Sequence, residues 1–205
     1  MTTTHFSMIR GFHLADVLTL ANAACGMIAL FLVVSYVETR DLWRLAGATA
    51  FIPVALVFDV LDGRVARWRR RHSAMGRELD SLADVISFGV APAVIAYGAG
   101  MRGVWDAAIL IYFVACGVSR LARFNVTAEA LSAGADKVKY FEGTPIPTSL
   151  ILVGVVAVLV WLGRVGDALP FGVVSLGPWA LHPLTLLWGV SGSLMISKTV
   201  RIPKI

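Results

Sequence analysis

Four aspartates at helical spacing stand in an otherwise apolar stretch of the chain. Asp59 and Asp62 are three residues apart, and Asp80 and Asp84 are four residues apart. Because an α-helix turns by about 100° per residue, the members of each pair lie about 60° and about 40° apart on one helical face. Two such faces turned toward each other would form a cage of four carboxylates.

A cage of this kind needs cations, because carboxylates in apolar surroundings are costly and repel one another. The pattern supplies only oxygen ligands, without His or Cys, which favours Mg²⁺, Mn²⁺ or Ca²⁺ over Zn²⁺. Two ions about 3.5–4 Å apart can polarise a phosphoryl oxygen and stabilise a leaving group. We therefore predict a metal site that involves Asp59, Asp62, Asp80 and Asp84. An alcohol acceptor would also need a base, and the spacing does not say which carboxylate serves.

The composition around this stretch is that of a polytopic membrane protein. Of the 205 residues, 58% are hydrophobic and only 15% are charged, which is outside the range of soluble domains. Segments of about 20 apolar residues can cross the ~30 Å hydrocarbon core as helices. We predict an all-α integral membrane fold with six transmembrane helices in a single domain, residues 1–205. The expected spans are 14–37, 45–67, 79–100, 104–126, 147–163 and 180–197.

The basic residues orient these six spans. If both termini lie on one side, that side holds fourteen Lys and Arg residues, and the other side holds Arg40, Arg44, Arg102 and Arg164. The positive-inside rule then places both termini and the aspartates on the cytoplasmic side of the cell (inner) membrane. The net charge of +5 fits a basic rim that contacts anionic lipid headgroups, so it does not require a nucleic acid partner.

The aspartates belong to a longer pattern, D-x2-D-G-x2-A-R-x8-G-x3-D-x3-D, which matches at all eight fixed positions. Its other members are Gly63, Ala66, Arg67 and Gly76. The pattern resembles the signature of the CDP-alcohol phosphotransferases, membrane enzymes that transfer a substituted phosphoryl group from a cytidine diphosphate donor to an alcohol. The resemblance implies a six-helix fold, a homodimer and a site that faces the cytosol.

The resemblance also implies roles for the matched residues. Asp59, Asp62 and Asp80 correspond to the metal ligands, for two Mg²⁺ or Mn²⁺ ions, and Asp84 corresponds to the base, near the second ion. The CDP donor is expected beside the first two aspartates and the small and basic positions of the signature, Gly63, Ala66, Arg67 and Gly76. From spacing alone, Gly63 and Ala66 at the end of the second span could equally serve close helix packing.

Polar residues at helical spacing in the first span form a second candidate group. Asp16, Thr19 and Asn22 recur every three residues and predict a stripe that points into the bundle. We expect Thr19 and Asn22 to contribute to the donor pocket, although interhelical hydrogen bonding would explain the stripe equally well.

The end of the fourth span carries a third group, Arg120, Arg123 and Asn125. The two arginines are three residues apart and share a helical face, so they could bind a phosphate or the carboxylate of the acceptor. The alternative is a pair of side chains that reach toward the lipid headgroups. Pro145 and Pro147 interrupt the helix that follows and could shape the mouth of the site.

Within the family, five stretches resemble the members that use CDP-diacylglycerol and L-serine and release CMP. They are residues 18–22, 80–92, 120–125, 143–147 and 194–198. If the acceptor is serine, our hypothesis is that Arg123 binds the serine carboxylate or the donor phosphate, supported by Arg120 and Asn125. The resemblance does not choose between direct displacement and a covalent intermediate.

Three other functions compete with this prediction. A sister enzyme would use glycerol 3-phosphate or inositol phosphate, and an archaeal-type enzyme would use an ether-lipid donor. A divalent-cation transporter would need polar positions that continue toward the outer face, whereas the outer halves of the expected spans are apolar.

Overall fold

The computed structural model describes residues 14–68, 74–132, 140–197 and 201–203. Eight of the fourteen basic residues expected on the cytoplasmic side lie outside these ranges. They are Arg10, Arg69, Arg70, Arg71, Lys137, Lys139, Lys198 and Lys204. The basic rim is therefore described only in part.

The described residues form seven α-helices. They are α1 (Leu14–Thr39), α2 (Leu42–Trp68), α3 (Ala74–Asp84), α4 (Ala91–Ala99), α5 (Val104–Ser132), α6 (Ser149–Trp161) and α7 (Leu186–Ile196). A π-helical segment, Val85–Val90, joins α3 to α4, and short 3₁₀ segments lead into α6 and α7, at Ile146–Thr148 and Pro183–Thr185.

The helices confirm an all-α membrane fold with several spans. Four helices are long and apolar enough to cross a bilayer, namely Leu14–Thr39, Leu42–Trp68, Met75–Ala99 and Val104–Thr127. The fifth and sixth predicted spans correspond to shorter apolar helices, Ile146–Trp161 and Pro183–Ile196. Their lengths do not establish a count of six, since a straight crossing takes about 20 residues.

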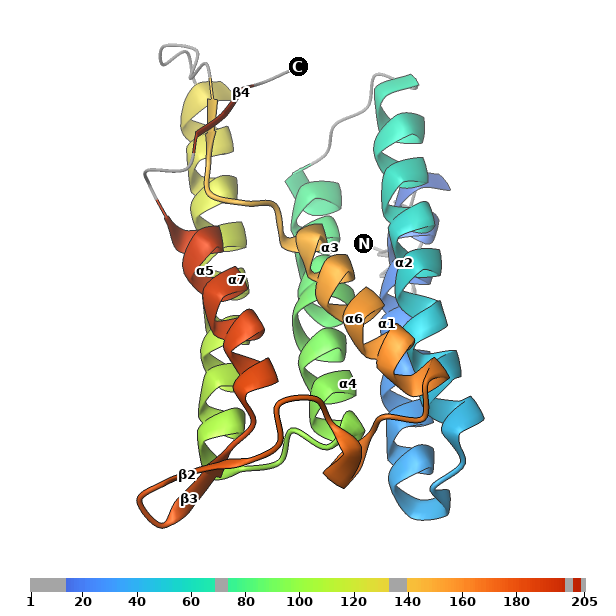
Figure 1. Ribbon diagram of the computed structural model, residues 1–205. Helices are drawn as coiled ribbons and strands as arrows, with labels where there is room; N and C mark the ends of the chain where they lie inside the picture. The colour runs from blue at the N-terminus through green and yellow to red at the C-terminus, as the bar shows by residue number, and fades with distance from the viewer. Residues whose placement is uncertain (1–13, 69–73, 133–139, 198–200, 204–205) are drawn as a thin grey trace, which may run out of the picture.

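The long helices stand side by side, and the short ones pack across them (Figure 1). Helix α1 packs along α2, the continuous rod of α3 and α4 lies between this pair and α5, and α7 packs along α5. Helix α6 crosses α2 and α4. The C-terminal ends of α2 and α5 and the start of α3 therefore lie at the same end of the bundle.

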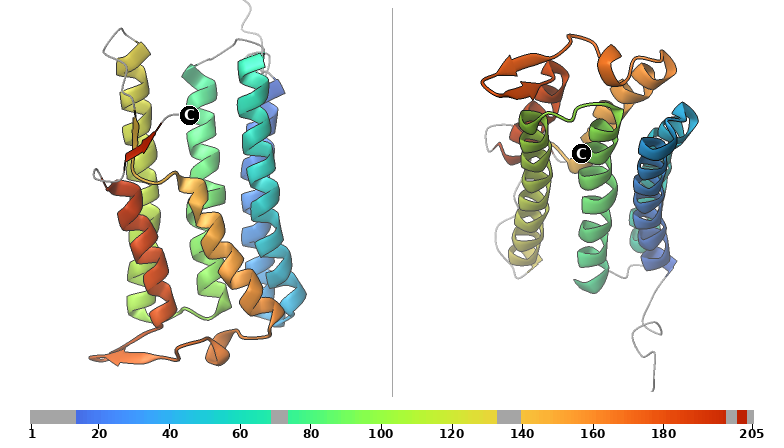
Figure 2. Two further views of the ribbon diagram at one scale, coloured as in Figure 1. Left: turned by 45° about the horizontal axis from the view of Figure 1, so that its top comes forward. Right: turned by 90° about the horizontal axis from the view of Figure 1, so that it is seen from below.

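Two small antiparallel sheets lie at opposite ends of the bundle (Figure 2). Strand β1 (Tyr140–Glu142) pairs with β4 (Arg201–Pro203) near the C-terminal end of α5, and β2 (Val174–Leu176) pairs with β3 (Trp179–Leu181) at the other end. The second pair is a hairpin that begins between the fifth and sixth predicted spans and ends inside the sixth, at Leu181. Gly177, with a φ of 65°, begins its two-residue turn, and positive φ there is the geometry that suits a tight hairpin.

Close helix packing surrounds the π-helical segment. A Cβ atom on Gly26 of α1 would lie 2.7 Å from Ser87 Oγ and 3.0 Å from the Ile86 side chain, so a larger residue would force the two helices apart. Ser87 Oγ donates a hydrogen bond of 2.9 Å to the carbonyl oxygen of Asn22. Through this contact the polar face of α1 packs against the continuous helix of α3 and α4, which carries Asp80 and Asp84. The small residue Gly26 allows this close approach.

A fully buried carboxylate lies at the end of the bundle far from the aspartate signature. Asp106 of α5 accepts hydrogen bonds of 2.8 Å from the backbone N–H of Gly103 and of His182, and from Thr185 Oγ1. His182 Nδ1 lies 2.5 Å from Asp106 Oδ2. The expectation that the outer halves of the spans are apolar is therefore wrong at this position. Because protein groups surround both oxygens, Asp106 ties α5 to the chain that enters α7.

Replacing Asp106 with alanine should destabilise the fold. The change leaves the buried groups of His182 and Thr185 without their hydrogen-bond partner, and each buried polar group left unsatisfied costs about 1–3 kcal/mol. We expect a clear fall in melting temperature for the detergent-solubilised protein, measured by intrinsic fluorescence. Glu38→Ala, at an exposed carboxylate near the end of α1, is the control and should leave the melting temperature within about a degree.

Candidate functional site

Three of the four signature aspartates converge from two helices. Asp59 and Asp62 come from α2 and Asp80 comes from α3, and one carboxylate oxygen of each lies within 4.8 Å of the others. Asp62 is buried, and the other two are half-buried. Oxygen ligands bind Mg²⁺ at about 2.0–2.1 Å and Ca²⁺ at about 2.3–2.6 Å, so oxygens this close to one another can share a hard divalent cation.

The hydrogen bonding of this acidic cluster also fits a cation. Asp80 Oδ1 is buried and has no hydrogen-bond partner among the described residues. A buried carboxylate oxygen without a partner carries a large desolvation cost. A bound cation would satisfy it and would offset the repulsion among three carboxylates. The residues present therefore fit a divalent metal site.

Helix α1 orients two of the aspartates. Thr19 Oγ1 donates a hydrogen bond of 2.5 Å to Asp62 Oδ2, and Asn22 Nδ2 donates one of 3.4 Å to Asp84 Oδ1. Asn22 is fully buried, and Thr19 and Asp16 are nearly so. The predicted polar stripe thus points into the bundle, and the side chains of Thr19 and Asn22 contact two of the carboxylates.

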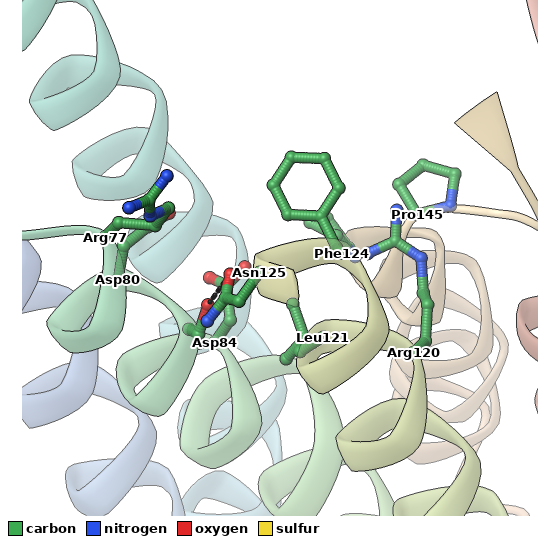
Figure 3. A pocket seen from close by; sticks show the side chains of 10 residues that line it. Arg77, Asp80, Asp84, Arg120, Leu121, Phe124, Asn125 and Pro145 are labelled. Atoms are coloured by element: carbon green, nitrogen blue, oxygen red, sulfur yellow. Dashed lines mark hydrogen bonds between the residues drawn. The ribbon is translucent and has the colours of Figure 1, made fainter. Parts of the chain in front are cut away.

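Asp84 lies one turn deeper along α3 than Asp80 and does not belong to the three-carboxylate group. It is 7% exposed, and it lines a cavity of about 160 Å³ together with Asp80. Figure 3 shows this cavity between side chains of α3 and side chains of α5. The full lining is Arg77, Asp80, Ser81, Asp84, Arg120, Leu121, Phe124, Asn125, Pro145 and Pro147.

Two guanidinium groups give the cavity positive charge. Arg77 comes from α3 and Arg120 from α5, and the Nε atom of each is buried without a hydrogen-bond partner among the described residues. An anionic ligand would supply the acceptors that these donors lack. Arg123, which shares a helix with Arg120, is exposed and does not line the cavity.

The remaining signature residues lie around the C-terminal end of α2 and the start of α3. Gly63, Ala66 and Gly76 are half-buried, and Arg67 is exposed. A Cβ atom added to Gly63 would meet nothing closer than the Arg67 guanidinium, at 3.8 Å. Protein packing therefore does not require glycine at position 63, and the open space beside it is available to a ligand.

Comparison with known proteins identifies the family. The sequence profile of CDP-alcohol phosphatidyltransferases matches residues 12–190. The chain belongs to this family. Membership confirms the family expected from the signature, the helical membrane fold and the class of enzyme, a transferase of substituted phosphate groups.

Individual CDP-alcohol phosphatidyltransferases are similar over most of the chain. The CDP-diacylglycerol–serine O-phosphatidyltransferase of Saccharomyces cerevisiae is 45% identical over 203 residues, which are 98% of this chain and 74% of that protein. The enzyme of the same name from Mycobacterium leprae is 37% identical over 160 residues, 77% of this chain and 49% of that protein. The archaetidylserine synthase of Methanothermobacter thermautotrophicus is 38% identical over 143 residues, 68% of this chain and 55% of that protein.

The structure adds residues that sequence analysis did not assign to the site of this family member. Arg77 was only one of the basic residues counted for orientation, and Glu78 and Ser81 had no assigned role in the site. Their shared signal is the three-residue spacing from Glu78 to Ser81, which puts both on one face of α3. The spacing does not show that this face of α3 lies against α5, which is what brings Glu78 and Ser81 to Asn125.

Proposed function

We propose that this protein transfers the phosphatidyl group of CDP-diacylglycerol to the hydroxyl of L-serine and releases CMP. One observation carries the proposal: Asp80 of the acidic cluster lines a cavity that also holds Asp84 and two guanidinium groups whose Nε atoms are buried. A small alcohol that bears an anionic group fits this combination. The cavity of about 160 Å³ is well below the ~300–1,000 Å³ typical of drug-sized ligands, which favours a small acceptor. The similar enzymes of Saccharomyces cerevisiae and Mycobacterium leprae are named for serine, which is such an acceptor.

In this proposal the chain's own residues bind and orient the two substrates. Gly63, Ala66, Arg67 and Gly76 contact the CDP donor, with Thr19 and Asn22 behind the carboxylates. Asp59, Asp62 and Asp80 would hold Mg²⁺ or Mn²⁺. When bound, the metal supplies charge neutralisation for the diphosphate and for the leaving CMP.

Asp84 is the proposed base for the acceptor. It takes the proton of the serine hydroxyl as that oxygen bonds to the β-phosphorus of the donor, while the bond from this phosphorus to the bridging oxygen breaks and CMP leaves with the electron pair. Asn22 donates to Asp84 Oδ1 and so leaves Oδ2 to face the substrate. Arg120 and Arg123 are the proposed contacts of the serine carboxylate or the donor phosphate, and Asn125 supports them.

The test follows CMP release by purified protein in detergent with CDP-diacylglycerol and Mn²⁺ or Mg²⁺. L-serine, glycerol 3-phosphate and inositol phosphate are offered separately. Metal-dependent release with serine alone is the expected result. Release only with a phosphorylated acceptor would overturn the serine assignment. Arg77 and Arg120 would then bind the phosphate of that acceptor.

Arg120 should matter more to acceptor binding than Arg123. Sequence analysis gave the leading role to Arg123, but Arg120 lines the cavity with a buried Nε, and Arg123 is exposed. A buried charge–charge contact is worth more than one screened by solvent. We expect Arg120→Gln to raise the KM for serine by tenfold or more and Arg123→Gln to raise it less than threefold, measured by CMP release. Equal effects would place both arginines at the acceptor.

We also propose a homodimer in the cell membrane with both termini and the site on the cytoplasmic side. The family resemblance supports the dimer, and the excess of basic residues at one end of the bundle supports the orientation. Arg64, Arg67 and Arg77 lie at the end that holds the acidic cluster, and the loop residues Arg40 and Arg102 lie at the other. Chemical crosslinking in native membranes tests the dimer, and labelling of single introduced cysteines from each side tests the orientation.

A further inference from the structure

A hydrogen-bonded link connects α3 to α5 at the edge of the cavity. Ser81 Oγ donates a bond of 3.1 Å to Asn125 Oδ1, and Asn125 Nδ2 donates a bond of 3.2 Å to Glu78 Oε2. Ser81 and Asn125 line the cavity, and Glu78 lies one helical turn from Ser81 toward the start of α3. The link thus holds a third carboxylate of α3, that of Glu78, next to Asn125. Asn125 lines the same cavity as the carboxylates of Asp80 and Asp84.

Glu78 differs in its role from the other acidic residues of α3. Asp80 belongs to the proposed metal cluster, and Asp84 is the proposed base. Glu78 belongs to neither. Its side chain is exposed and does not itself line the cavity, but it accepts a hydrogen bond from Asn125, which does. A carboxylate accepts hydrogen bonds at several lone pairs, so the single bond from Asn125 leaves Glu78 able to accept more. Asn125 already uses both ends of its amide, which fixes the position of the Glu78 carboxylate.

The charges around the cavity match a zwitterion. Arg77 and Arg120 provide cationic groups for a carboxylate, and Glu78 provides an anionic group on the same side as Asn125. L-serine carries one group of each sign next to its hydroxyl. Glycerol 3-phosphate and inositol phosphate carry only negative charge, which a rim carboxylate would repel.

We propose that Glu78, held by Asn125, binds the ammonium group of the acceptor and selects amino-alcohol acceptors over purely anionic ones. The inference rests on the proposed function, because it assigns a second contact to the same acceptor. It makes Asn125 a positioning residue that holds the α3 carboxylate against α5.

The test compares Glu78→Gln with Glu78→Asp in the full-length protein in detergent. Gln keeps an acceptor for Asn125 and removes only the charge, while Asp keeps the charge. We expect Glu78→Gln to raise the KM for serine about fivefold with a smaller change in kcat, and Glu78→Asp to stay closer to the original protein. The inhibition constant of 3-hydroxypropionate, which has the hydroxyl and carboxylate of serine without its ammonium, should not rise. Glu38→Gln, at an exposed carboxylate at the far end of α1, is the matched control.

The outcomes separate this inference from the function on which it rests. Absence of serine-dependent CMP release in the original protein would remove both. Serine-dependent release with an unchanged KM in Glu78→Gln would overturn the inference alone. An equal rise of the serine KM and the 3-hydroxypropionate constant would also overturn it, because it would show that Glu78 only supports Asn125.

Discussion

Asp80→Asn is expected to abolish metal-dependent CMP release, with a loss of about a thousandfold or more. Asp80 is the carboxylate that α3 contributes to the cluster with Asp59 and Asp62, and its Oδ1 is buried without a partner among the described residues. Asparagine has nearly the same shape but lacks the charge. The change should therefore remove a metal ligand, and with it several kcal/mol of charge stabilisation in the transition state, while the helices keep their packing.

Two measurements check this prediction together. Mn²⁺ binding is followed by titration calorimetry, and CMP release is followed over a range of Mn²⁺ concentrations. Asp167→Asn, at an exposed aspartate at the opposite end of the bundle, is the matched control and should change neither quantity. Near-normal metal affinity and turnover in Asp80→Asn would refute the metal site as built here.

Asp84→Asn is expected to stop transfer while the cluster still binds metal. General base catalysis contributes about 10²–10⁴-fold, and an amide cannot accept the proton of the serine hydroxyl. Asp84 lies outside the group formed by Asp59, Asp62 and Asp80, so the Mn²⁺ affinity of that group should change less than threefold. The contrast with Asp80→Asn separates proton transfer from metal binding.

The same calorimetric titration decides the outcome for Asp84. Activity lost with metal affinity retained supports the base. A parallel loss of Mn²⁺ binding would make Asp84 a metal ligand instead and would require another proton acceptor. Asn22→Ala is a useful third variant, because it removes the hydrogen bond to Asp84 Oδ1 without changing any carboxylate, and it should lower kcat less than Asp84→Asn does.

Much of the candidate site was predictable because the spacing of residues within a single helix determines which of them share a face. The three-residue and four-residue spacings place Asp59 with Asp62, and Asp80 with Asp84, on single helical faces whatever the rest of the chain does. The same holds for the stripe of Thr19 and Asn22, which the structure buries against the carboxylates. Hydrophobic length alone predicted the four long spans, because a bilayer requires backbone hydrogen bonds to be satisfied within each helix.

Features that depend on which helices become neighbours were not predictable from these patterns. The link from Ser81 through Asn125 to Glu78 joins residues more than forty positions apart, and neither helix shows in its own sequence that it faces the other. The preference for Arg120 over Arg123 has the same origin. Both lie on one helical face, and only packing against α3 and Pro145 encloses the first of them.

The opposite end of the bundle shows the same division between local and long-range information. Asp106 and His182 are 76 positions apart, and each alone is an isolated polar residue near the end of an apolar segment. Their contact arises because α5 and α7 pack together, which brings the chain before α7 onto the start of α5. The sequence by itself determined the membrane fold, the family and the four carboxylates, because helical periodicity and a contiguous signature express them. Tertiary packing decided which carboxylates converge and which arginine enters the cavity, because both depend on how side chains of distant segments fill the space between helices.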